Sequence, residues 1–433
     1  YNLSCDAATF TLTGFDANLY RNRKVLAETT LFIVTGKDAN LERSYKLNAD
    51  SGSFTLTGYP VVFLIPVVCI RVDDSGNTRV TSTGDVRVID EDTCPQGILA
   101  SSGTFDLTGT DATLTYNKVT YTLVADSGTF NLSGYSAWLG YHLRVQATNG
   151  SFTLTGFDAD LRRKKKILTA DSGSFVLTGN DAALHRNYAL DVESGSFVLT
   201  GNDADLDTSR TLTVESGAFT FTGTAADLHR NYYLSAESGT FIFTGYDVAL
   251  SYGSVTIILA ETGVFNLTGT DATLTHVQKF SISCDSGAFI LTGTDAVLSH
   301  HRNAIPADSG TFVLTGSDVT LRNDHRLAAD SGSFTFAGSD AGLQRGYPLS
   351  AENGAYTLIG FDATLTKYGA SSISVESGTF VLSGGFARLE KNYKAQPVSI
   401  SFVLSGTDAQ LHHNKQIIAE NGLYSLTGID AET

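Results

Sequence analysis

The sequence predicts an all-β protein built as a tandem array of repeats about 22 residues long, and three observations lead to this fold class. The segment ESGSFVLTGNDADL at 193–206 nearly copies DSGSFVLTGNDAAL at 171–184. An aromatic residue recurs in 18 units, and a glycine follows it four residues later in each of them. The recurring F-x-L-x-G also alternates apolar and polar residues with period 2, which is typical of a strand with one buried face.

The recurring aromatic residue begins the first strand of each unit and is expected to be buried, as at Phe175, Phe197 and Phe219. Successive aromatics lie 22 to 25 residues apart, except between Phe54 and Phe105. The full set is Phe10, Phe32, Phe54, Phe105, Phe130, Phe152, Phe175, Phe197, Phe219, Phe241, Phe265, Phe289, Phe312, Phe334, Tyr356, Phe380, Phe402 and Tyr424.

A turn follows the first strand. The glycine that ends the strand, as at Gly179, Gly201 and Gly223, indicates either a positive φ or closely packed backbone. An aspartate follows two residues later in 14 units, as at Asp181 and Asp203, and can accept a backbone N–H within its own turn. Calcium-binding nonapeptide repeats also contain Gly-x-Asp, but one Asp per 22 residues does not bring several oxygens together. We therefore expect no metal or other cofactor.

Two further strands complete each unit. A-x-L resumes the alternation in the opposite phase, and a final L-x-A or L-x-V strand ends in D/E-S-G, a second turn signal. The longer units, at 113–125 and 249–260, resemble two strands joined by a tight turn. Each unit should therefore contain three short strands and three turns.

So small a unit cannot bury its own apolar face, and stacking on equivalent neighbours does so. We prefer a β-solenoid in which each unit forms one coil, with an antiparallel meander of hairpins as the alternative. In the solenoid, Asp158, Asp181 and Asp203 would stack about 5 Å apart, and their repulsion would need Asx-turn hydrogen bonds or cations. In the meander the equivalent spacing would be about 10 Å or more.

The pattern divides the chain into repeat units 1–3 at 1–58, an inserted β-hairpin element at 59–101, and repeat units 4–18 at 102–433. Cys69 and Cys94 lie in the insert and are candidates for a disulfide. Cys5 and Cys284 occupy an inward position where other units have Ala or Val, and we expect buried structural thiols there.

Basic residues and histidines gather after the A-x-L strand, which suggests contact with a polyanion such as a surface glycan. An exposed turn with polar tips explains the same pattern, and no spacing there matches a metal-ligand set. The candidate contact residues are Arg162, Arg163, Lys164, His185, Arg186, His229 and Arg230.

Composition and motifs exclude other function classes. The net charge of −16 argues against nonspecific nucleic-acid binding. No apolar run of about 18 residues predicts a membrane span. Nucleophile-elbow, phosphate-loop and zinc motifs are missing, and a residue repeated 14 times is not a unique catalytic centre. We therefore expect no enzymatic activity.

The repeat S-G-x-F-x-L-T-G-x-D-A-x-L, as at 172–184 and 286–298, resembles tracts in structural proteins of tailed bacteriophages, especially tail or virion fibres. The resemblance covers nearly all of the chain outside 59–101, and one unit departs from it with Phe386 in place of Asp. It implies a location on the virion.

The sequence therefore predicts a structural repeat protein that forms a rod or filament on a phage particle and contacts the host surface. The alternative is a secreted bacterial adhesin or extracellular fibre; a glycan-active enzyme would need a catalytic domain outside this chain. The chain contains no Met and begins and ends within a unit, so we expect its ends to meet further protein. Expected partners are copies of itself or other virion proteins stacked end to end, and a host-surface glycan.

Overall fold

The computed structural model consists of β-strands, turns and bends within the residues that it describes, which confirms the all-β prediction. These residues are 2–5, 9–20, 24–27, 31–42, 46–49, 53–65, 97–100, 102–116, 121–139, 143–162, 166–185, 188–207, 210–229, 232–252, 256–276, 280–300, 305–323, 327–344, 349–351, 353–366, 371–375, 378–390, 393–397, 401–412, 416–417, 423–428 and 430–432. Over these ranges, no helix has the length and apolar character to cross a membrane. The chain forms two compact units, unit 1 (Tyr1–Tyr188) and unit 2 (Ala189–Thr433), which are described separately.

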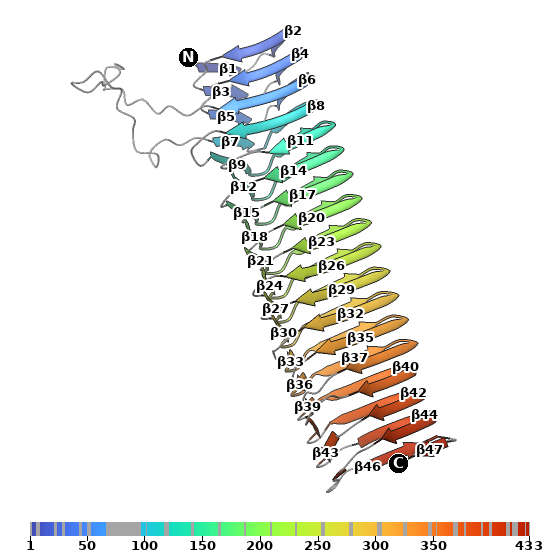
Figure 1. Ribbon diagram of the computed structural model, residues 1–433. Helices are drawn as coiled ribbons and strands as arrows, with labels where there is room; N and C mark the ends of the chain where they lie inside the picture. The colour runs from blue at the N-terminus through green and yellow to red at the C-terminus, as the bar shows by residue number, and fades with distance from the viewer. Residues whose placement is uncertain are drawn as a thin grey trace, which may run out of the picture. The chain divides into compact units, whose positions relative to one another are not determined.

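One turn of the chain, called a coil below, contains three strands. A typical coil of unit 1 consists of β13 (Ser151–Thr155), β14 (Asp158–Arg162) and β15 (Lys166–Ala170). Each strand pairs in parallel with its counterpart in the next coil, as β13 does with β16 (Ser174–Thr178) at Phe152↔Phe175. Figure 1 shows equivalent strands side by side within each unit. Parallel pairing of equivalent positions confirms the β-solenoid, and the antiparallel meander is wrong.

In its described residues, unit 1 contains seven first strands, which carry the recurring aromatic residue. They are β2 (Phe10–Tyr20), β4 (Leu31–Glu42), β6 (Ser53–Ile65), β8 (Thr104–Tyr116), β10 (Thr129–Ser133), β13 and β16. The first four also include the A-x-L segment; in the later coils this segment is a separate strand, namely β11 (Ser136–Leu139), β14 and β17 (Asp181–His185). The third strands are β1 (Asn2–Cys5), β3 (Lys24–Ala27), β5 (Lys46–Ala49), β7 (Gly97–Ala100), β9 (Tyr121–Ala125), β12 (Leu143–Ala147) and β15.

Over the part of it that the structure describes, unit 2 repeats the same arrangement with eleven first strands. They are β19 (Ser196–Thr200), β22 (Ala218–Thr222), β25 (Thr240–Thr244), β28 (Val264–Thr268), β31 (Ala288–Thr292), β34 (Thr311–Thr315), β37 (Ser333–Ala337), β40 (Ala355–Thr366), β42 (Thr379–Glu390), β44 (Ser401–His412) and β46 (Leu423–Thr427). Separate second strands are β20 (Asp203–Asp207), β23 (Ala225–His229), β26 (Asp247–Tyr252), β29 (Asp271–His276), β32 (Asp295–His300), β35 (Asp318–Asn323), β38 (Asp340–Gln344) and β47 (Asp430–Glu432). The third strands are β18 (Tyr188–Val192), β21 (Arg210–Val214), β24 (Tyr232–Ala236), β27 (Thr256–Ala260), β30 (Phe280–Cys284), β33 (Ile305–Ala307), β36 (Leu327–Ala329), β39 (Leu349–Ala351), β41 (Ser371–Val375), β43 (Tyr393–Pro397) and β45 (Gln416–Ile417).

The recurring aromatic rings form a buried stack in each unit, as the sequence predicts. Phe175, Phe197 and Phe219 are at most 2 % exposed. In unit 1 the ring centroids of Phe130 and Phe152 lie 4.7 Å apart with an interplanar angle of 4°. Stacked rings at the spacing of adjacent strands remove large apolar surfaces from water, so each unit has a continuous core.

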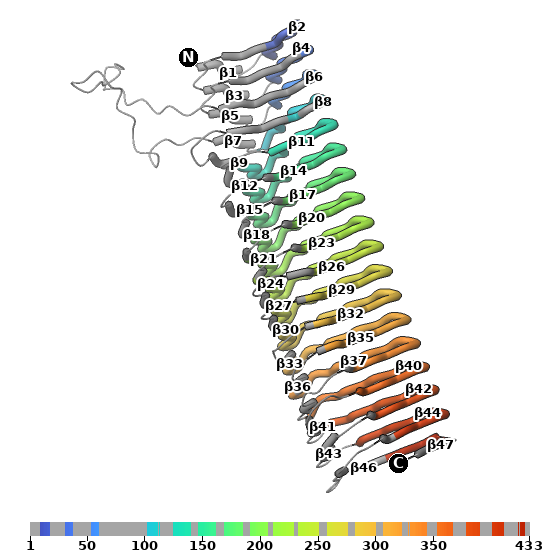
Figure 2. The backbone as a smooth tube through the Cα atoms, in the orientation of Figure 1, coloured from blue at the N-terminus to red at the C-terminus, as the bar shows by residue number. Residues whose placement is uncertain are grey.

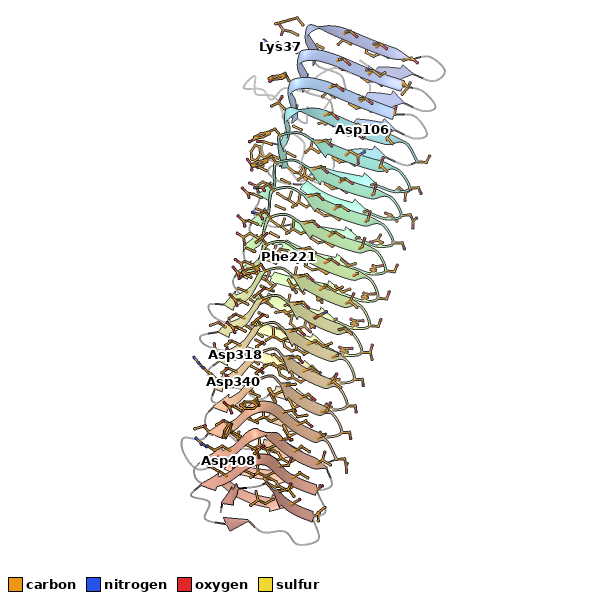
Figure 3. The ribbon with its side chains drawn as sticks, turned by 90° about the vertical axis from the view of Figure 1, so that its right-hand side faces the viewer. Lys37, Asp106, Phe221, Asp318, Asp340 and Asp408 are labelled. Carbon is orange, nitrogen blue, oxygen red and sulfur yellow. The ribbon has the colours of Figure 1, made fainter. Side chains whose placement is uncertain are left out.

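The stack tilts at several places in unit 2, one of them where phenylalanines replace the leucine two residues on in two consecutive coils. Phe219 and Phe241 meet at an interplanar angle of 42°, and Phe221 and Phe243, the residues two positions after them, are both fully buried. Phe221 carries more volume than the leucine of other coils, so the neighbouring rings pack at an angle to fill the space. Figure 3 labels Phe221 within this core.

The chain doubles back between the first and second strands, and Figure 2 shows this bend at the start of β14 and of β23. The buried positions change phase across the bend: in β40, Tyr356 and Leu358 are buried before it, and Ala363 and Leu365 after it. The predicted opposite phase of the A-x-L segment is therefore confirmed.

The glycine at this bend is required by close packing, and the alternative of a positive φ is wrong for the glycines that the structure describes. A Cβ on Gly179 would lie 2.9 Å from the carbonyl oxygen of Gly156 and 3.0 Å from the Cβ of Ala159, both one coil earlier. A Cβ on Gly223 would lie 2.8 Å from the carbonyl oxygen of Gly201. Adjacent coils approach too closely here for any side chain.

The longer coils contain two strands at 249–260, as predicted, and these two strands belong to different sheets. β26 pairs in parallel with β23 and β29, whereas β27 pairs in parallel with β24 and β30 in the other sheet. The same holds at 113–125, where β8 and β9 belong to different sheets. The connecting residues 117–120 and 253–255 lie outside the described residues.

The repeat array extends into the segment assigned to the insert. β6 continues to Ile65, where it pairs with Tyr116 of β8, and β7 resumes the array at Gly97. Residues 66–96, the main part of the predicted insert, lie outside the described residues. The predicted hairpins and the candidate disulfide between Cys69 and Cys94 fall within 66–96 and so lie outside them as well.

Candidate functional site

The Gly-x-Asp bend forms the most regular exposed edge of each unit, and backbone hydrogen bonds hold it between coils. The N–H of Asp158 donates to the carbonyl of Tyr135 at 3.1 Å, and the N–H of Gly156 donates to the carbonyl of Thr178 at 3.0 Å. The Asp158 side chain is exposed. The bend is thus fixed by its neighbours, and its side chains are free to vary.

The aspartates of the bend stack in register. Asp158 is paired with Asp181 in unit 1, and in unit 2 an unbroken series runs through Asp247, Asp271, Asp295, Asp318, Asp340 and Asp362. Figure 3 shows Asp318, Asp340 and Asp408 along one edge of unit 2. Asp203 is aligned with Ala225 on its unit 2 side, so the column is interrupted there. The Asx-turn hydrogen bonds remain a prediction. Within the described ranges no three His, Cys, Asp or Glu side chains are grouped to hold a metal ion.

A second acidic column lies at the D/E-S-G turn of unit 2. Its described members are Glu193, Glu215, Glu237, Glu261, Asp285, Asp308 and Asp330, one per coil and all exposed. Desolvation raises the pKa of the Asp308 carboxyl, and the negative charges of Asp285 and Asp330 raise it further. Carboxylates in adjacent coils of this column therefore repel each other, which destabilises the folded state slightly.

Replacing Asp308 with asparagine should increase the free energy of unfolding by a fraction of a kcal/mol at neutral pH and low salt, because solvent screens exposed charges. The melting temperature should rise slightly as a result. A raised pKa means that the folded state holds this proton more tightly than the unfolded chain does. The repulsion is therefore absent below the ordinary pKa of 3.8 and develops as the pH rises through the raised value. Calorimetry between pH 3 and pH 7, at low and high salt, measures the difference. The neutral exchange Ser309→Asn is the control, and a gain from Asp308→Asn that is as large in high salt as in low salt would contradict the contribution of repulsion from Asp285 and Asp330.

Exposed aromatic residues gather at the bend of unit 1, at the position directly after its glycine. Phe15, Tyr59, Tyr135 and Phe157 are 72 %, 66 %, 58 % and 47 % exposed. The rings of Tyr135 and Phe157 stack at 5.0 Å with an interplanar angle of 1°, and the ammonium of Lys37 lies 4.9 Å from the Phe15 ring centroid. We call these four residues the aromatic corner. The repeat consensus does not predict them, because the residue at this position varies from unit to unit. The sequence feature that identifies them is a Phe or Tyr directly after the bend glycine.

The predicted polyanion-contact residues are only partly described. Arg162 ends β14 and is aligned with His185 of β17 in unit 1. His229 ends β23 and is aligned with Asp207 and Ser251 in unit 2. Arg163, Lys164, Arg186 and Arg230 lie outside the described residues. The backbone thus brings one Arg–His pair to adjacent positions, and polyanion contact remains a prediction.

Cys284 is fully buried at the end of β30, in the inward position predicted from the repeat. Burial raises the pKa of its thiol from 9.0 to about 12, with a further contribution from the negative charge of Asp285. The reactive thiolate is therefore scarce at neutral pH. Cys5 ends β1, and its side chain lies outside the described part.

A variant that keeps only Cys284, with serine at positions 5, 69 and 94, should resist labelling by a disulfide reagent at pH 8 while folded. After unfolding in urea, one thiol per chain should react, because both the burial and the raised pKa are lost. Adding an exposed cysteine by Ser286→Cys gives the matched control, which should react at once. Rapid labelling of Cys284 in the folded protein would show that its coil opens readily.

Comparison of the chain with protein-family models, curated proteins and solved structures gives no match.

Proposed function

We propose that this chain is a non-enzymatic structural protein that forms a rod or filament, as a tail or virion fibre of a tailed phage. The in-register stacking of coils within each unit carries this proposal. Each coil binds the next through parallel strands, so the same 22-residue segment can be added repeatedly and length increases without a new fold. The resemblance of the repeat to phage structural tracts supports the virion as the location, and virion proteins or copies of the chain as partners.

The net charge of −16 supports this role because a rod whose surface is acidic repels its neighbours and stays dispersed. The stacked aspartates and the D/E-S-G column distribute much of this charge along the edges of the coils. A secreted bacterial adhesin or extracellular fibre is the second candidate. It is favoured by the same solenoid, together with the exposed aromatic corner of unit 1 as a contact surface.

Electron microscopy tests both proposals. The purified protein should appear as rods, and gold-labelled antibodies against it should decorate fibres on phage particles from the same source. Decoration of bacterial surfaces in cultures without phage particles would favour the adhesin. A globular appearance of the purified protein would contradict the fibre in either form.

A further inference from the structure

We propose that the aromatic corner of unit 1 binds an uncharged glycan, which would give the proposed fibre its surface ligand. The inference rests on that proposed function for its biological setting, and on Phe15, Tyr59, Tyr135 and Phe157 for its chemistry. Their four rings follow one edge of the solenoid, at equivalent positions of different coils.

The solenoid itself does not require aromatic rings at this position. In unit 2 the equivalent residues are mostly small and polar. They are Asn202, Thr224, Tyr246, Thr270, Thr294, Ser317, Ser339, Phe361, Gly385 and Thr407. With Ile429 of the last coil, unit 2 has two aromatic residues among eleven of these positions, whereas unit 1 has four among seven. Large rings that are about half or more exposed lose the benefit of burial, so a ligand explains their presence better than stability does.

The surroundings of the rings supply polar groups on both sides. On the side of the first strand lie threonine hydroxyls, with Thr13 and Thr155 exposed. On the side of the second strand lie the exposed carboxylates of Asp16, Asp158 and Asp181. Sugar rings present apolar C–H faces and a rim of hydroxyl groups. Aromatic rings fit the former, and carboxylates and threonine hydroxyls can hydrogen-bond to the latter.

Charge selects among glycans. Carboxylates beside the rings repel sulfated or uronic-acid chains, so the corner favours uncharged sugars. Lys37 beside Phe15 shows that a cation also fits against a ring, so a cationic ligand is the alternative that the experiment must distinguish. The corner is also linear, with rings on adjacent or alternate coils, which suits a chain of sugar units better than a compact cation.

Tyr59 and Tyr135 suggest where a sugar unit enters. They lie two coils apart, on either side of the half-buried Thr110. Two coil spacings amount to roughly 10 Å. With a small residue in the intervening coil, this span leaves room for one sugar ring between the two tyrosines.

A glycan array carrying uncharged and acidic oligosaccharides tests the proposal with the full chain. We expect binding to uncharged glycans, and a loss of at least tenfold in the double variant Tyr135→Ser/Phe157→Ser. Serine occurs naturally at this bend position, in Ser317 and Ser339, so the variant should fold, and circular dichroism checks this. Tyr246→Ser, the same change at an isolated ring in unit 2, is the matched control and should bind like the wild type.

Several results would overturn the proposal: no bound uncharged glycan, binding confined to acidic glycans, or equal binding by the double variant. If the wild type binds polylysine and the double variant does not, the ligand of the aromatic corner is a cation instead. A decrease in molar mass of the double variant in light scattering would identify a contact between copies of the chain. If antibodies decorate the phage particles but the array shows no bound glycan, the glycan inference is rejected and the proposed fibre function stands. Array binding without decoration would reject only the proposed location.

Discussion

Replacing Phe289 with alanine should destabilise the surrounding coils of unit 2 by about 3–5 kcal/mol. The Phe289 ring is fully buried and stacks on Phe312 at a centroid distance of 5.0 Å. Alanine leaves a cavity between coils whose backbones are fixed by parallel pairing, so the neighbours cannot close it. Unfolding in urea, followed by hydrogen exchange, measures the loss and its position along the chain.

The effect of Phe289→Ala should be local because each coil contacts only its neighbours. The first coils of unit 1 should keep their hydrogen-exchange protection. Phe386→Ala provides the matched control, because the same ring is removed from a site where it is 45 % exposed, and it should cost much less. Equal costs for the two variants, or loss of protection throughout unit 1, would contradict the independent-coil description.

Replacing Gly287 with alanine should cost about 3 kcal/mol, near the upper end of the usual range for overpacking. Its Cβ would lie 2.3 Å from the carbonyl oxygen of Gly263 and 2.9 Å from that of Ala260. Both atoms belong to the backbone of the preceding coil, where the Gly263 carbonyl also accepts the N–H of Ala288 at 3.0 Å. The coils must therefore separate at this turn, which weakens the hydrogen bonds on both sides.

Gly342→Ala should have the opposite sign. In β38 a Cβ on Gly342 would meet nothing closer than the carbonyl oxygen of Val319 at 3.9 Å, an ordinary contact. Removing a strand glycine there should stabilise unit 2 by roughly 0.5–1 kcal/mol. Thermal unfolding of Gly287→Ala and Gly342→Ala tests whether packing between coils is what requires glycine at 287. If both variants lower the melting temperature equally, it is not.

The sequence predicts the coil well because the pattern is repeated many times. The buried positions of Phe175, Phe197 and Phe219, the phase change at the bend and the inward slot of Cys284 all follow from periodicity alone. The pattern at 249–260 predicts two strands but does not show whether they pair with each other or with adjacent coils, because both cases look alike in sequence. Which pairing occurs depends on neighbours one coil away, which the local pattern does not contain.

The role of the bend glycine was left open for a related reason. A positive φ and a close approach of two backbones both demand glycine, and only the distance between coils distinguishes them, as at Gly179. The aromatic corner is not predicted by the repeat consensus, because the consensus contains only the positions that most units share. Tyr135 and Phe157 stand at a position that varies, and their significance depends on their being stacked in space.

The parallel register also determines how each unit would respond to tension. The hydrogen bonds between strands run along the direction in which coils stack, so a pull along that direction loads the outermost coil first. That coil can peel away while those behind it remain folded. Each release would free about 22 residues, or roughly 70 Å of extended chain, before the next coil bears the load. Each unit would thus yield in repeated steps of similar length and absorb mechanical work over a long extension.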